Sequence, residues 1–129
     1  TKNQRSKTEQ ILSLVHELGH QLWYIHERNR KPYLKFEEAL DRQNLHEIDV
    51  YEKPPPKSLR EKIYKVEKES TEYWEVIYKD VGLKIPLWKL NSAMELDIWM
   101  YEQYLKTGHF PKNKDKKAKR KELKNKHKK

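Results

Sequence analysis

The stretch VHELGHQLWYIH, residues 15–26, carries the pattern H-E-x-x-H at His16, Glu17 and His20. On a helix, residues four positions apart lie one turn apart on the same face, so both imidazoles can reach one metal ion. The chain has no cysteine, which leaves His, Asp and Glu side chains as candidate ligands. The pattern therefore predicts a zinc site on a helix.

The residues around this motif predict a packed amphipathic helix. Ser6 and Glu9 have the S-x-x-E spacing of a capping box, so the helix should begin near Lys7. At about 100° per residue, the apolar positions share one broad face, with the two histidines along its edge. These positions are Ile11, Leu12, Val15, Leu18, Gly19, Leu22 and Trp23. The small Gly19 would let a neighbouring segment approach closely.

The glutamate of the motif suggests hydrolytic chemistry. Zinc lowers the pKa of a bound water and polarises a carbonyl, and Glu17 would take the proton of that water and pass it to a leaving amine. The motif thus predicts peptide-bond hydrolysis with Glu17 as the catalytic residue. The alternative interpretation is an accidental match on a solvated helix face.

The rest of the chain predicts further helices and only weak, short β-like segments. A long helix should begin at Ser58 and end at Gly82, ahead of Pro86. Its apolar stripe comprises Ile63, Val66, Tyr73, Trp74, Ile77 and Val81. A last helix should run over residues 87–106, with Gly108 and Pro111 after it. We expect a mainly α fold with at most a minimal β element.

Two segments between the first and second helices have different signals. Residues 33–45 predict a short helix or an irregular lid, and the three prolines at 54–56 predict a rigid extended connector. The connector would separate two halves of the core.

The sequence LSLVHELGH, residues 12–20, resembles the active-site helix of zincin metallopeptidases. It resembles in particular the small gluzincin-like domains related to the ImmA/IrrE group, which are found in phage and mobile-element proteins. The resemblance implies a zinc-dependent peptidase over roughly residues 8–86, acting on a protein or peptide substrate. In that group the third ligand is a glutamate on a later helix, followed by a small residue, with an aromatic residue four positions after it.

The segment ESTEYW, residues 69–74, is similar to that setting, with Glu69, Ser70 and Tyr73 in the matching positions. It departs from the pattern at Trp74, where the group has a small residue. The resemblance therefore implies that His16, His20 and Glu69 bind zinc.

Three other residues compete with Glu69 for the place of third ligand. Glu72 points further from the apolar stripe of its helix. His26 has the metzincin spacing H-E-x-x-H-x-x-W-x-x-H, but a continuing helix would put it about 15 Å along the axis from His16. Asp97 lies on the apolar face of the last helix, where a carboxylate needs a partner. It could bind the metal or accept a hydrogen bond from His16 or His20.

The net charge of +9 comes from one end of the chain. Residues 112–129 hold eleven Lys or Arg against two acidic residues, whereas residues 1–111 hold eighteen of each sign. With Leu123 as its single large apolar residue, this segment predicts a basic tail that is disordered or a frayed helix when free, after a zincin-like domain at residues 1–111. Nucleic acid is the partner such a tail could take.

Neither a membrane span nor a signal peptide is visible in the sequence, since no apolar run is long enough. We expect no membrane partner and an intracellular, cytoplasmic location, with the nucleus or a virion as alternatives.

Overall fold

The computed structural model describes residues 6–27 and 56–128, and within these ranges the chain forms four helices and no strand. They are α1 (Lys7–Glu27), α4 (Lys57–Val81), α5 (Leu87–Thr107) and α6 (Asn113–His127). The prediction of a mainly α fold is confirmed. The expected helix or lid at residues 33–45, and Pro54 and Pro55 of the expected connector, lie outside the described residues.

The helix ends follow the local signals in the sequence. The hydroxyl of Ser6 accepts a hydrogen bond from the backbone N–H of Glu9 at 3.2 Å, which caps α1 as expected. Gly82 and Gly108 end α4 and α5 with φ of 71° and 83°. This left-handed conformation favours glycine, and it lets each glycine N–H bond a carbonyl of the last turn.

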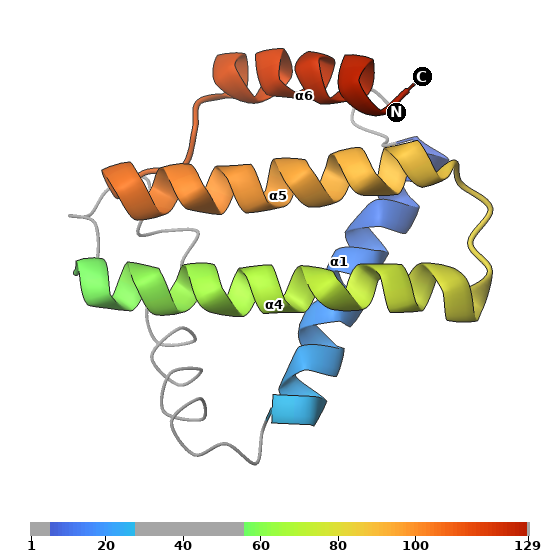
Figure 1. The fold of residues 1–129 in the computed structure, drawn as a ribbon, viewed down its shortest axis with the longest axis horizontal. Coiled ribbons are helices and arrows are strands. Elements are labelled where there is room, and N and C mark those ends of the chain that lie inside the picture. The colour runs from blue at the N-terminus through green and yellow to red at the C-terminus, as the bar shows by residue number, and fades with distance from the viewer. Residues whose placement is uncertain (1–5, 28–55, 129) are drawn as a thin grey trace.

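Three of the helices form a layer, and the fourth crosses it (Figure 1). α4 and α5 run antiparallel side by side, and α6 lies along the other side of α5. α1 crosses α4 obliquely and makes its main contacts with that helix. The motif on α1 therefore faces the middle of α4 rather than one of its ends.

Among the described residues, the hydrophobic core has two clusters that lie on either side of this crossing. One cluster centres on Trp23, Ile63, Val66 and Tyr104, and the other on Val15, Trp74, Ile77 and Leu90. Between them along α4 come Glu67, Ser70 and Thr71, each at most 3% exposed. The buried stripe of α4 is thus polar where α1 crosses it. Such polar groups are costly to bury unless they have partners.

Gly19 allows the close crossing of the two helices. A Cβ atom at this position would lie 2.8 Å from Trp74 Cδ1 and 2.9 Å from the backbone oxygen of Ser70. Real Cβ atoms do not approach other atoms so closely, so a larger residue would push α1 away from α4. The expectation that Gly19 admits a close neighbour is met by α4.

The basic segment differs from the expected disordered tail, because residues 113–127 form helix α6 against α5. Leu123 is only 2% exposed, and Lys126 and His127 both contact the Glu95 carboxylate, at 3.0 and 3.1 Å. The ammonium group of Lys119 lies 5.7 Å from the ring centre of Trp99. The prediction from composition considered this segment without partners. In the structure α5 supplies the contacts that hold the segment as a helix.

Within the described residues, no helix is both long and apolar enough to cross a bilayer.

Candidate metal centre

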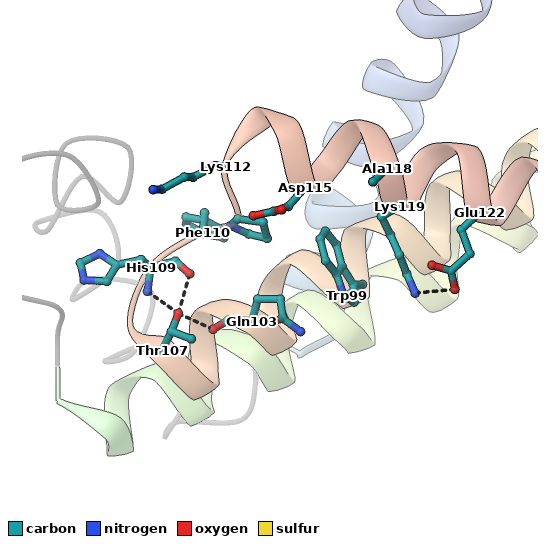
Figure 2. A pocket seen from close by; sticks show the side chains of 11 residues that line it. Trp99, Gln103, Thr107, His109, Phe110, Lys112, Asp115, Ala118, Lys119 and Glu122 are labelled. Carbon is teal, nitrogen blue, oxygen red and sulfur yellow. Dashed lines mark hydrogen bonds and ion pairs between the residues drawn. The ribbon is translucent and has the colours of Figure 1, made fainter.

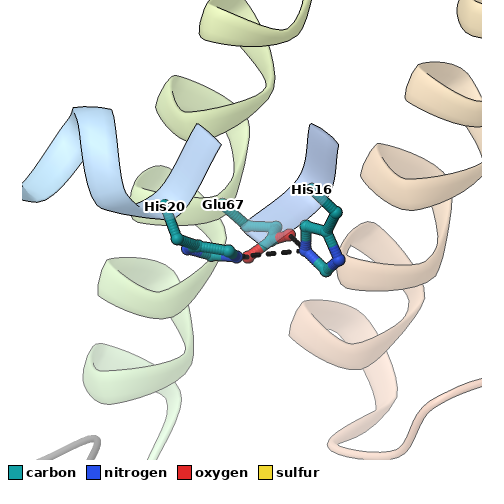
Figure 3. A group of neighbouring side chains, drawn as sticks. All are labelled: His16, His20 and Glu67. Atoms are coloured by element: carbon teal, nitrogen blue, oxygen red, sulfur yellow. Dashed lines mark hydrogen bonds and ion pairs between the residues drawn. The ribbon is translucent and has the colours of Figure 1, made fainter. Parts of the chain in front are cut away.

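The two motif histidines lie side by side on α1 and face α4 (Figure 3). Their Nε2 atoms are 3.0 Å apart, and their ring centres are 4.8 Å apart. Each side chain is about one-third exposed, so the pair lies at the edge of the core. One turn of helix therefore brings two imidazole nitrogens to the same point, as the spacing predicts.

Glu67 of α4 reaches both histidines from the opposite side (Figure 3). Its Oε1 lies 2.8 Å from His16 Nε2, and its Oε2 lies 3.0 Å from His20 Nε2. Burial by itself would raise the pKa of Glu67, but hydrogen bonds from His16, His20 and Asp97 outweigh it and hold the pKa well below its usual range. Glu67 is therefore a buried carboxylate that stays ionised.

The three groups have the donor set of a divalent metal site. Their ligand atoms all lie within 4.8 Å of one another, and two imidazoles with one carboxylate are a common set of protein ligands for catalytic zinc. At these distances an imidazole N–H can donate to the Glu67 carboxylate, which would keep two bare nitrogens from facing it. A divalent cation could replace such protons, since metal binding releases protons from its ligands.

A neighbouring hydroxyl helps to orient one of the ligands. Ser70 Oγ lies 3.5 Å from His20 Nδ1, where it can accept a hydrogen bond from that nitrogen. Such a bond turns Nε2, the other ring nitrogen, toward Glu67 and His16. Ser70 is fully buried, so this contact is fixed by the packing of α1 on α4.

Asp97 of α5 is a neighbour of Glu67 in the core. Its Oδ1 is 3.9 Å from His16 Nε2, and it shares a hydrogen bond with Glu67. Burial and the negative charge of Glu67 raise the pKa of Asp97 to about 10, so its carboxyl group is neutral at pH 7 and donates to Glu67. The sequence allowed Asp97 as a metal ligand or a partner of the histidines, and the structure places it as the group that supports Glu67.

Tyr101 lies one turn after Asp97 on α5. Burial raises the pKa of its phenol well above the ordinary value, and the charges of Glu67, Asp97 and, more weakly, Glu17 add to the effect. The phenol is therefore a permanent O–H group close to the cluster.

The structure brings Glu67 to the histidines, and not Glu69 as the resemblance implied. Glu69 Oε1 instead accepts a hydrogen bond from Trp23 Nε1 at 3.4 Å. Residues two positions apart on a helix point about 200° away from each other, so Glu67 and Glu69 cannot share one face. Glu69 meets α1 nearer the end of α1, at Trp23. A signal for Glu67 was present in the sequence, because it lies four residues after Ile63 on the buried stripe.

The other two alternatives lie apart from the cluster. The His26 ring stacks on Tyr73, with ring centres 5.5 Å apart and an angle of 9°. α1 continues as a helix through Trp23 to Glu27, which is why His26 does not swing back to the first two histidines. The Glu72 side chain is exposed on α4.

A separate pocket of about 600 Å³ lies between the end of α5 and the start of α6 (Figure 2). Its lining includes Trp99, Phe110, Asp115 and Lys119, and none of the three clustered residues. The candidate metal centre therefore lies outside this pocket.

The chain matches no known protein family, no curated protein and no solved structure. The similarity to zincins thus rests on the residues of the motif and stays a prediction.

Proposed function

We propose that the protein is a zinc-dependent peptidase that binds the ion through His16, His20 and Glu67. The observation that carries this proposal is the convergence of His16 Nε2, His20 Nε2 and the Glu67 carboxylate within 4.8 Å. Two histidines from one helix and a carboxylate from another leave further coordination positions for water and substrate. A zinc ion held there would supply Lewis-acid chemistry, lowering the pKa of a water and polarising a carbonyl.

In this proposal the remaining polar residues move or hold protons around the bound peptide. Glu17, exposed beside His16, is the general base that takes a proton from the attacking water and passes it to the leaving amine. The neutral Asp97 donates to Glu67 and fixes the orientation of that ligand. The Tyr101 phenol, protonated at any working pH, can donate to developing negative charge on the substrate.

The test separates metal binding from catalysis. We would measure zinc by elemental mass spectrometry, and cleavage of unfolded casein and of a mixed peptide library, for wild type and Glu17→Gln. Removing the base while sparing the ligands should leave zinc content unchanged and lower cleavage by about 100-fold or more. Glu72→Gln, which changes another exposed glutamate, is the matched control and should keep both properties.

Two results would contradict the proposal in different ways. Wild-type protein that takes up no zinc after reconstitution would exclude the metal centre. Stoichiometric zinc with no cleavage of either substrate, by wild type or by the control, would make the centre structural.

A further inference from the structure

We propose that the outer face of α6 binds the phosphate backbone of double-stranded nucleic acid, independently of the metal centre. The inference starts from how charge is arranged on this helix. Lys114, Lys117, Lys121 and Lys124 follow one another at intervals of three, four and three residues. At 100° per residue they fall within about 80° of the helix circumference. We call these four residues the lysine stripe.

The lysine stripe faces away from the body of the protein. All four lysines are exposed, whereas Leu123, on the opposite side of α6, is 2% exposed against α5. α5 lies between α6 and α4 in Figure 1, so the outer face of α6 is also remote from the crossing of α1 and α4. A long ligand could therefore lie along the lysine stripe without covering the metal centre.

The other charges of α6 lie off this face. Asp115 and Glu122 are at about 120° to 140° from the centre of the stripe, and both line the pocket between α5 and α6 (Figure 2). Within the described residues, the salt bridges of α6 use Lys119, Lys126 and His127. One set of cations thus pairs with acidic groups of α6 itself and of α5, and the lysine stripe is a second set that faces solvent.

This arrangement opposes the stability of the helix. Like charges three and four residues apart repel, and none of the stripe residues has an acidic neighbour on its face. A polyanion would relieve that repulsion. From Lys114 to Lys124 the stripe covers ten helical rises, or about 15 Å. Duplex strands present one phosphate per about 3.4 Å of axis, so about four phosphates of one strand match this length.

The composition of the outer face selects the kind of polyanion. It carries no aromatic residue on which an unpaired base could stack, which disfavours single strands. It also carries no large apolar residue that could enter a lipid bilayer, because Leu123 is used against α5. Lysines are compact charges on flexible stems, so they suit phosphates without reading base edges. We therefore infer binding to a duplex without sequence preference.

The experiment uses the full chain and fluorescently labelled 20-base-pair DNA and RNA duplexes, single-stranded poly-dT and vesicles containing anionic lipid. In the stripe variant, all four stripe lysines are changed to Gln. The control variant changes Lys57, Lys62, Lys79 and Lys84 to Gln, four exposed lysines outside α6, and so has the same net charge. Circular dichroism checks both folds, and removing repulsion from α6 should leave its helix intact.

We expect wild type and the control variant to bind duplex with similar affinity and a steep salt dependence. Four phosphate contacts give a slope of about −3.6 in log K against log salt, or about a 150-fold loss of affinity between 50 and 200 mM. The stripe variant should bind at least tenfold more weakly at 100 mM salt, with a slope close to zero. Similar binding of both duplexes would support backbone recognition.

Equal losses in the two variants would show that only net charge matters and would overturn the proposal. Binding confined to vesicles, or tighter binding to poly-dT than to either duplex, would overturn it as well. None of these readouts uses zinc or peptide cleavage, so the result is independent of the proposed peptidase function.

Discussion

His16 Nε2 on α1 lies 2.8 Å from Glu67 Oε1 on α4, although 51 positions separate the two residues in the chain. The contact exists because Gly19 lets α1 cross α4 closely at the polar part of its buried stripe. The same crossing brings His20 to the other oxygen of the Glu67 carboxylate. The candidate metal centre is thus a property of one helix crossing, and it can be tested there.

Zinc content should depend on Glu67 and not on Glu69. Glu67→Gln removes the carboxylate that meets both histidines, so zinc affinity should fall by more than the roughly 10- to 100-fold cost of losing an outer partner. Glu69→Gln, two residues away, should keep its contact with Trp23 and bind zinc normally. Competition with a fluorescent chelator measures both affinities. If Glu69→Gln loses zinc and Glu67→Gln keeps it, Glu69 is the third ligand, as the resemblance implied.

Asp97→Asn should stabilise the metal-free protein at neutral pH. The folded protein keeps the Asp97 proton up to about pH 10, whereas the unfolded chain loses it near the ordinary value of 3.8. Between these values the folded state binds more protons, so Asp97 makes stability fall as pH rises. An asparagine cannot ionise and can still donate to Glu67. Its free energy of unfolding at pH 8, measured by urea denaturation with chelator present, should be higher by about 1 kcal/mol or more.

The control for this experiment is Asp80→Asn, which changes an exposed aspartate on α4. It should leave both the stability and its pH dependence close to wild type. A loss of stability in Asp97→Asn between pH 6 and 9 would mean that the carboxyl group is ionised in the folded protein.

Gly19→Ala should separate the two helices. The added Cβ would lie 2.8 Å from Trp74 and 2.9 Å from the Ser70 carbonyl oxygen, and crowding of this kind costs about 1–3 kcal/mol. Alanine is the better helix former by about 1 kcal/mol, so a net loss of stability would come from tertiary crowding. Thermal denaturation measures the change, and zinc affinity should fall with it. Gln21→Ala, at an exposed position of α1, should have neither effect.

Leu123→Ala should release α6 from α5. The side chain is 2% exposed, and truncating a buried leucine costs about 2–5 kcal/mol when its surroundings cannot collapse. A 15-residue helix rich in lysine is not stable alone, so the loss of docking should melt it. Circular dichroism should show less helix, and trypsin should cleave first within residues 113–127. Unchanged helix content would show that α6 does not depend on this contact.

The sequence predicted most of the helical architecture because its signals are local. Ser6 and Glu9 mark the start of α1, and Gly82 and Gly108 mark the ends of α4 and α5 through backbone conformations that glycine adopts most readily. A stable, docked α6 was not predicted, because its single buried leucine, Leu123, stabilises the helix only when it packs against a partner helix. Composition describes a segment by itself and contains no information about α5.

The two histidines were also determined by the sequence, since four-residue spacing on one helix brings them together whatever else the chain does. The choice among Glu67, Glu69, Glu72 and Asp97 depended on where α1 crosses α4 and on which side α5 packs. A shift of two residues turns a glutamate to another side of its helix. Gly19 indicates a close approach on α1, but no local signal shows which residues of α4 it meets. The sequence by itself determined the histidine pair, and only the tertiary structure decided that Glu67 meets it and that Asp97 lies next to Glu67.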